Sequence, residues 1–145
     1  FNRFSEKEVV NKAIINNIKP EILTEWLEYL DSEREPVELL SEDIIIGVND
    51  TVNGVPAKLI NFIAEEEGNY LVMAIDSEQG DIDLFVGEFI DGELYELDRD
   101  NGNSFYPFVS MELNKGTEIY IYIIYPDMEE ETKETSRVKF WLYKE

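Results

Sequence analysis

Closely spaced oxygen-bearing side chains between residues 98 and 104 could coordinate a hard cation. The segment reads Asp-Arg-Asp-Asn-Gly-Asn-Ser, in which the glycine permits a sharp turn. Carboxylate and amide oxygens are the ligands that calcium prefers in proteins. The candidate calcium ligands are Asp98, Asp100, Asn101 and Asn103. Because no glutamate completes the EF-hand pattern, an ordinary hairpin turn rich in Asp and Asn is the favoured interpretation.

Aromatic and aliphatic side chains alternate in the last two predicted strands, residues 117–125 and 137–143. Successive side chains of a strand point to opposite faces. If these strands pair as a hairpin, their aliphatic faces join the core and the opposite face presents four rings. The predicted ligand-binding rings are Tyr120, Tyr122, Trp141 and Tyr143. Such a row suits recognition of an extended protein or polysaccharide; the alternative is that residues 1–40 cover the rings as a second core.

Asp81 and Asp83 stand two positions apart in a predicted strand and therefore share one face. Paired carboxylates can hold a cation or perform acid–base chemistry. Acid–base chemistry also needs a second acid at a defined distance and a substrate cleft, and neither can be identified from the sequence. We interpret the pair as polar residues at a strand edge, with cation binding as the alternative.

The residue composition excludes several classes of catalytic site. The 145-residue chain contains no histidine and no cysteine, which removes thiol nucleophiles, imidazole-dependent triads and Cys/His zinc sites. We therefore predict that the protein is not an enzyme. Its 12 basic and 33 acidic residues give a net charge of −21, which repels nucleic acid and favours basic partners. No apolar run reaches the ~18 residues of a bilayer span, so membrane insertion is not expected.

The hydrophobic periodicity changes near residue 41. Residues 1–40 show helical spacing, with a capping box at Ser5–Glu8 and an apolar stripe from Ile22 to Leu30. This predicts a helical pair that is too short to be stable alone and must pack on another surface. Residues 41–145 alternate apolar and polar positions between turn signals, which is typical of an antiparallel β-sandwich. The predicted strands span residues 44–48, 57–64, 69–75, 81–88, 94–97, 104–113, 117–125 and 137–143.

Several segments, taken in order, give the chain a family resemblance. They are Gly68–Val72, Gly80–Val86, the loop at residues 98–104, and Leu113–Thr117 leading into the aromatic strand Tyr120–Ile123. This order resembles the bacterial pre-peptidase C-terminal domain, which combines a glycine-led strand, a D-x-D-L-aromatic strand and a Gly-Thr entry into an aromatic strand. The resemblance covers roughly residues 44–145, and it is specific as an ordered set rather than through any one segment.

The resemblance implies a jelly-roll-like antiparallel β-sandwich that is non-catalytic and accompanies exported bacterial proteins, at the cell surface or outside the cell. Collagen-binding domains of clostridial collagenases are similar to this family. Some of them bind calcium. An aromatic sheet surface binds their ligand, so the resemblance supports the candidate ring surface. The N-terminal helical pair and the strong acidity depart from the family pattern.

Two functions are favoured by these observations, and a carboxylate-dependent hydrolase is the third and least favoured class. The first is an exported accessory module that recognises a protein or polysaccharide through the four rings, with calcium as an optional ligand and no other cofactor. The alternative is an acidic inhibitor or immunity-type protein that binds a basic partner. Binding that weakens steeply with salt would favour the alternative.

Overall fold

The computed structural model describes residues 37–102 and 104–144, and the regular elements in this part of the chain are strands. They are β1 (Val37–Gly47), β2 (Thr51–Val52), β3 (Val55–Ile63), β4 (Gly68–Asp76), β5 (Asp83–Ile90), β6 (Glu93–Asp100), β7 (Phe108–Leu113), β8 (Glu118–Ile124) and β9 (Thr135–Lys144). Each strand that the alternation predicts is present, and β2 is an additional short one. The described part of the chain contains no helix long and apolar enough to cross a membrane.

The predicted helical pair falls mostly on residues 1–36 and so lies outside the described residues. Its last four predicted positions, residues 37–40, belong instead to β1, where Val37 pairs with Lys144 and Leu40 with Leu142 of β9. The backbone hydrogen bonds of this pairing outweigh any local preference for a helix. The sandwich therefore begins before residue 41.

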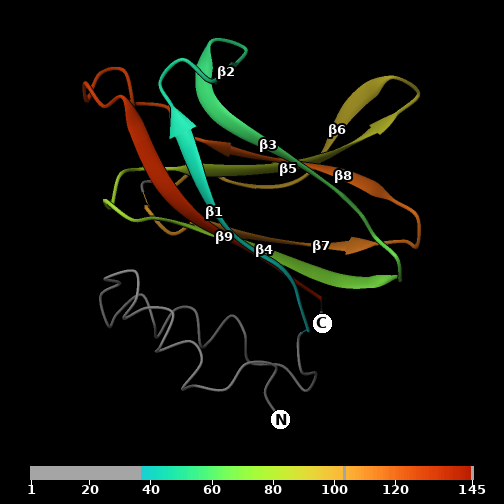
Figure 1. The fold of residues 1–145 in the computed structure, drawn as a ribbon. Coiled ribbons are helices and arrows are strands. Elements are labelled where there is room, and N and C mark those ends of the chain that lie inside the picture. Colours follow the sequence, from blue (N-terminus) through green and yellow to red (C-terminus); the bar gives the residue numbers. More distant parts are fainter. Residues whose placement is uncertain (1–36, 103, 145) are drawn as a thin grey trace.

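The strands form two antiparallel sheets that pack face to face (Figure 1). One sheet has the strand order β1-β9-β4-β7, and the other has the order β2-β3-β8-β5-β6. All the paired neighbours run antiparallel. The prediction of a mainly β, antiparallel sandwich is therefore confirmed.

Alternate residues of the strands build the core between the sheets. β8 contributes Ile119, Ile121 and Ile123, and β9 contributes Val138, Phe140 and Leu142. These side chains are completely buried, whereas Tyr120 and Tyr122 point away from the core and are only partly buried. A strand with one face on the core requires this two-residue alternation.

Two tight turns match their sequence signals. Asn53 and Gly54 join β2 to β3 with φ values of 52° and 82°, and Asp91 and Gly92 join β5 to β6 with φ values of 51° and 83°. Positive φ at both central residues defines the turn that suits the twist of a β-hairpin, and Asn-Gly and Asp-Gly accept it most readily. The β5–β6 turn fixes the register of the hairpin that carries much of the candidate site.

The last two strands do not form the predicted hairpin. β8 lies between β3 and β5, whereas β9 lies between β1 and β4 in the other sheet. The connecting residues cross from one sheet to the other, and they are held there by Tyr125, which is fully buried and donates a hydrogen bond to Glu131 Oε1 at 2.7 Å. Both strands direct aliphatic side chains into the same core from opposite sides, so the alternation is satisfied without direct pairing.

Candidate functional site

The four rings predicted to form one surface lie on opposite sides of the sandwich. Tyr120 and Tyr122 extend from β8 on the outer face of the five-stranded sheet. Trp141 and Tyr143 extend from β9 on the other sheet, outside the core cluster, and they are only 3% and 1% exposed. The prediction of a single four-ring surface is wrong, because β8 and β9 belong to different sheets.

Two phenylalanines of β5, which the sequence alone does not single out, complete an aromatic surface around the β8 tyrosines. Phe85 lies opposite Tyr122 in the register, with ring centroids 5.7 Å apart at 68°. Phe89 meets Tyr120 with centroids 4.9 Å apart at 87°. Edge-to-face contacts of this kind are favourable and hold both rings in place. We call the surface formed by these four rings the ring face.

Exposed aliphatic side chains border the ring face. Leu59 lies opposite Tyr122 and is 45% exposed, and Leu94 lies opposite Phe89 and is 39% exposed. Ile63, four residues further along β3 and opposite Glu118, is 55% exposed. Contiguous apolar surface of this kind marks contact sites on soluble proteins.

An apolar hollow of about 310 Å³ opens at one end of the ring face, beside the β2–β3 turn. Its lining residues are Val52, Asn53, Val55, Ala57, Phe85, Leu94, Tyr122 and Ile124. Because Phe85 and Tyr122 belong both to the ring face and to the wall of the hollow, the two form one continuous surface. A concave apolar site of this size can accept a side chain or a ring of a ligand.

The other end of the ring face is polar. The amide of Asn61 donates a hydrogen bond to Glu118 Oε2 at 3.3 Å. Burial raises the pKa of Tyr120, and the Glu118 carboxylate raises this pKa further. The Tyr120 hydroxyl therefore stays protonated at neutral pH and remains a hydrogen-bond donor.

An ion pair of β6 lies along the edge of the ring face. The Arg99 guanidinium is 5.7 Å from the ring centroid of Phe85, and its Nε is paired with Glu96 Oε1. The guanidinium covers part of Phe85 through a cation–π contact. Because Glu96 balances its charge, Arg99 does not make this edge basic.

Aspartate side chains concentrate negative charge beside the hollow. Burial, followed by the charges of Asp81, Asp100 and Asp127, raises the pKa of Asp83 to about 6. Asp83 lies opposite Ile124 of the hollow, and its Oδ1 is buried with no hydrogen-bond partner among the described residues. Asp81, the other member of the predicted carboxylate pair, accepts a hydrogen bond from Ser104 N at 3.1 Å. The pair therefore contributes to structure and local charge.

The predicted calcium ligands are used to join strands. Asp98 Oδ2 accepts a hydrogen bond from Ser110 N at 3.0 Å, and Asp100 Oδ2 accepts one from Phe108 N at 3.1 Å, so both carboxylates link β6 to β7. Asp100 Oδ1 also accepts from Gly102 N at 3.2 Å. Asn101 is exposed, and Asn103 lies outside the described residues. Within residues 37–102 and 104–144, no group of three or more acidic side chains is arranged to hold a metal ion; calcium binding stays a prediction.

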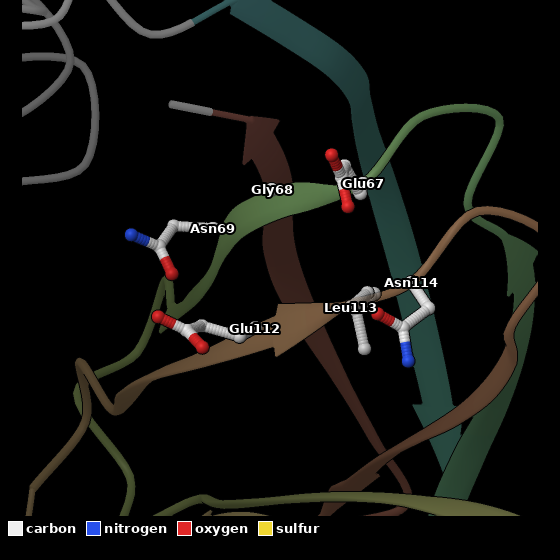
Figure 2. Close-up of a pocket in the computed structure, with 6 residues that line it drawn as sticks. All are labelled: Glu67, Gly68, Asn69, Glu112, Leu113 and Asn114. Atoms are coloured by element: carbon white, nitrogen blue, oxygen red, sulfur yellow. The ribbon is translucent and has the colours of Figure 1, made fainter.

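A polar hollow of about 390 Å³ lies at the edge of the four-stranded sheet, where β4 begins and β7 ends (Figure 2). Its lining residues are Glu67, Gly68, Asn69, Glu112, Leu113 and Asn114. Asn69 and Glu112 are opposite each other in the register, and their side chains lie close together in Figure 2. This hollow belongs to the other sheet and is separate from the ring face.

The comparisons with known proteins identify no family for this chain. No family model matches the chain, and no curated protein matches it. A similar solved structure is PliG, a periplasmic inhibitor of g-type lysozyme from Aeromonas hydrophila, with a TM-score of 0.43 and 10% identity, covering 74% of this chain and 83% of that chain. Another is a mutant of CBM29-2, a family 29 carbohydrate-binding module, with a TM-score of 0.38 and 8% identity, covering 74% of each chain. Neither protein is described as a pre-peptidase C-terminal or collagen-binding domain. The resemblance to the pre-peptidase C-terminal domain therefore stays a prediction.

Proposed function

We propose that this chain is a non-catalytic binding module that docks a protein through the ring face. The observation that carries the proposal is the exposed apolar surface around Phe85, Phe89, Tyr120 and Tyr122, which continues into the hollow. The centre of a protein–protein contact is typically apolar and rich in aromatic residues, with a polar rim. The ring face has this arrangement, since Asn61, Glu96 and Glu118 lie around its aromatic centre.

Charge supports a basic partner. The chain carries a net charge of −21, and the carboxylates around Asp83 lie next to the hollow. Electrostatic complementarity accelerates encounter and discriminates against acidic competitors. A partner with lysine or arginine around an apolar contact region fits both features, and it combines the two functions that the sequence suggests.

A polysaccharide is the second candidate ligand. It is favoured by the two edge-to-face ring pairs on a sheet surface and by the hydrogen-bonding groups of Asn61, Glu118 and Tyr120. The exposed aliphatic side chains Leu59, Ile63 and Leu94 favour a protein over a sugar, because they offer no hydrogen bonds to hydroxyl groups.

The strand order supports the finer description of the fold. A jelly roll is expected to have two facing sheets with the strand orders β1-β9-β4-β7 and β3-β8-β5-β6, as found here. β2 is added at one edge of the second sheet. An exported, cell-surface or extracellular location and membership of the pre-peptidase C-terminal family belong to the same proposal. They are supported by the sequence resemblance.

The test uses two probes and matched variants of the full chain. We expect a cationic amphipathic peptide of alternating leucine and lysine to bind, with Tyr122→Ala and Phe85→Ala each weakening binding by about 2 kcal/mol, roughly 30-fold in Kd. Ile45→Ala is the control, because Ile45 is a 54% exposed aliphatic residue of β1 in the other sheet. The affinity should also fall as salt is raised.

Three outcomes would count against the proposal. Binding of a soluble neutral β-glucan, but not of the peptide, would replace the protein partner with a polysaccharide. Peptide binding that is unchanged in both ring variants would remove the ring face. If the correctly folded chain bound neither probe, the ring face would also be excluded as a binding site.

A further inference from the structure

The outer face of the four-stranded sheet carries a second set of large apolar side chains, distinct from the core. They are Leu71, Met73 and Ile75 of β4 and Trp141 and Tyr143 of β9, which we call the outer patch. The register places Leu71 opposite Tyr143 and Met73 opposite Trp141, so the patch is continuous across the two central strands. None of its members is more than 3% exposed, and none belongs to the core cluster.

We propose that residues 1–36 of this chain cover the outer patch. In residues 37–102 and 104–144 the chain forms two sheets, and the five-stranded sheet packs on the opposite side, against the core face of β4 and β9. A sheet that faces water on one side carries polar residues there, which the outer patch does not. A layer of apolar side chains must therefore lie over the patch.

The place where the leading segment joins the sandwich identifies this layer. Val37, the first residue of β1, pairs with Lys144, which directly follows Tyr143 of the outer patch. Residues 1–36 therefore join the sheet beside the patch. They contain the apolar stripe Ile22, Leu23, Trp26, Leu27 and Leu30 at helical spacing, which must pack on another surface.

The dimensions and polar borders of the patch agree with this occupant. Four strands span about 14 Å between the outermost axes, and the predicted helical stripe from Ile22 to Leu30 is also about 14 Å long. On the β1 side the patch is bordered by the Lys139–Asp43 ion pair, at 3.3 Å, and by the hydrogen bond from the Tyr143 hydroxyl to Glu38 Oε1, at 2.8 Å. Asn69 and Glu112 border it at the polar hollow (Figure 2). An amphipathic segment, apolar towards Met73 and polar at its margins, fits such a surface.

The consequence for function is that the two outer faces have different roles. The outer patch is an internal contact, so Trp141 and Tyr143 serve stability, and the ring face is left for a partner. This inference does not depend on the identity of that partner.

The first experiment uses the two tryptophans of the chain. In a Trp26→Phe background, Trp141 is the remaining fluorophore, and we expect blue-shifted emission that acrylamide quenches weakly. Adding Leu23→Glu and Leu27→Glu should shift the emission to the red and increase the quenching several-fold. Leu59→Glu, beside the ring face on the other sheet, is the control and should leave Trp141 emission unchanged. Strong quenching of Trp141 before the glutamates are added, or no response to them in the folded chain, would overturn the proposal.

The second experiment leaves the leading segment unaltered. Because the chain has no cysteine, Ser110→Cys places a unique attachment point for a photo-crosslinker on β7, opposite Leu71. We expect the crosslinker on Ser110→Cys to capture peptides from residues 1–36 of the same molecule. A crosslinker on Leu59→Cys, beside the ring face, should capture no peptide from residues 1–36. Mixing ¹⁴N- and ¹⁵N-labelled chains separates this result from contact between two copies. Crosslinks that join differently labelled chains, or that omit residues 1–36, would overturn the proposal.

Discussion

Phe89 and Tyr120 meet edge to face, with ring centroids 4.9 Å apart, beside the position where β5 carries Gly87. Gly87 lies opposite Tyr120, and a Cβ atom built on it would come within 2.8 Å of Tyr95 O and 2.9 Å of Leu94 Cδ1. Gly87 is also at the bulge of the β5–β6 pairing. The absence of a side chain there lets β6 approach closely while the ring of Tyr120 contacts Phe89.

Gly87→Ala should therefore destabilise the sandwich. The new methyl group would press on a backbone oxygen, which cannot move as a side chain can, and overpacking of this kind costs about 1–3 kcal/mol. Urea unfolding followed by circular dichroism measures the loss. Gly102→Ala is the matched control, because its nearest neighbour would be Asp100 Oδ1 at an ordinary 3.5 Å. Equal stability of the two variants would contradict the packing that we describe at Gly87.

Asp76→Ala should be among the most destabilising single changes in the described residues. Asp76 is completely buried, its Oδ2 accepts a hydrogen bond from Gly80 N at 2.6 Å, and its Oδ1 accepts one from the Ser136 hydroxyl. The alanine variant leaves the buried Ser136 hydroxyl and the part-buried Gly80 N–H without their acceptor, at a cost of about 2–4 kcal/mol in the free energy of unfolding. Ser77→Ala serves as the control: it removes a single exposed hydrogen bond, to Arg137 O at 2.9 Å, and should cost less than about 1 kcal/mol. If Asp76→Ala were no more damaging than Ser77→Ala, the buried network would not be an anchor.

Asp83→Asn should stabilise the protein at pH 7 and reduce the dependence of stability on pH. The ordinary pKa of 3.8 applies to the unfolded chain, whereas burial and neighbouring aspartates raise the folded value to about 6. At pH values between these two pKa values, Asp83 is protonated in the folded chain and loses its proton on unfolding. The stability of the parent protein therefore falls as pH rises from about 4 to about 6. The variant lacks this loss and should melt a few degrees higher at pH 7, with the advantage shrinking towards pH 4.

Thermal melts at pH 4, 5, 6 and 7 would test this prediction. Glu130→Gln removes one negative charge from an exposed loop position and controls for the change in net charge. A gain for Asp83→Asn that equals the gain for Glu130→Gln at every pH would show that only the overall charge matters.

Much of the fold could be predicted from local patterns in the sequence. The two-residue alternation in β8 places Ile119, Ile121 and Ile123 in the core, and the Asn53-Gly54 and Asp91-Gly92 pairs mark hairpin turns. These features depend on the few residues around each position, so they are visible without any knowledge of the partner strands.

The pairing of strands could not be predicted in the same way. An inward aliphatic face on β9 satisfies the alternation equally well whether the strand pairs with β8 or with β1 and β4. The missing pairing information affects the candidate site most. The alternation alone predicts that Tyr120 and Tyr122 share a surface with Trp141 and Tyr143, whereas β8 and β9 lie in different sheets. Their actual neighbours, Phe85 and Phe89, are brought to them by the pairing of β5 with β8, which joins segments far apart in the sequence.

The contacts of the acidic residues at the end of β6 also could not be predicted from the sequence. Asp98 and Asp100 have the spacing of cation ligands, yet their carboxylates accept backbone hydrogen bonds from Ser110 and Phe108. The sequence identifies these side chains as possible cation ligands. Only the position of β7 beside β6 shows that their oxygens accept hydrogen bonds from its backbone.

Asp100→Ala should consequently lower stability to the same extent with and without calcium. The change removes the acceptor for Phe108 N, at 3.1 Å, and for Gly102 N, at 3.2 Å, and the loss of these bonds should cost about 1–3 kcal/mol. Asn101→Ala, at an exposed position of the same turn, should have little effect in either condition. Melting temperatures of the parent and both variants, in millimolar calcium and in chelator, provide the measurement. Since a ligand that binds the native state raises its stability, a calcium-dependent rise in the parent that is lost in Asp100→Ala would show that this carboxylate holds the ion and that its role in joining β6 to β7 is secondary.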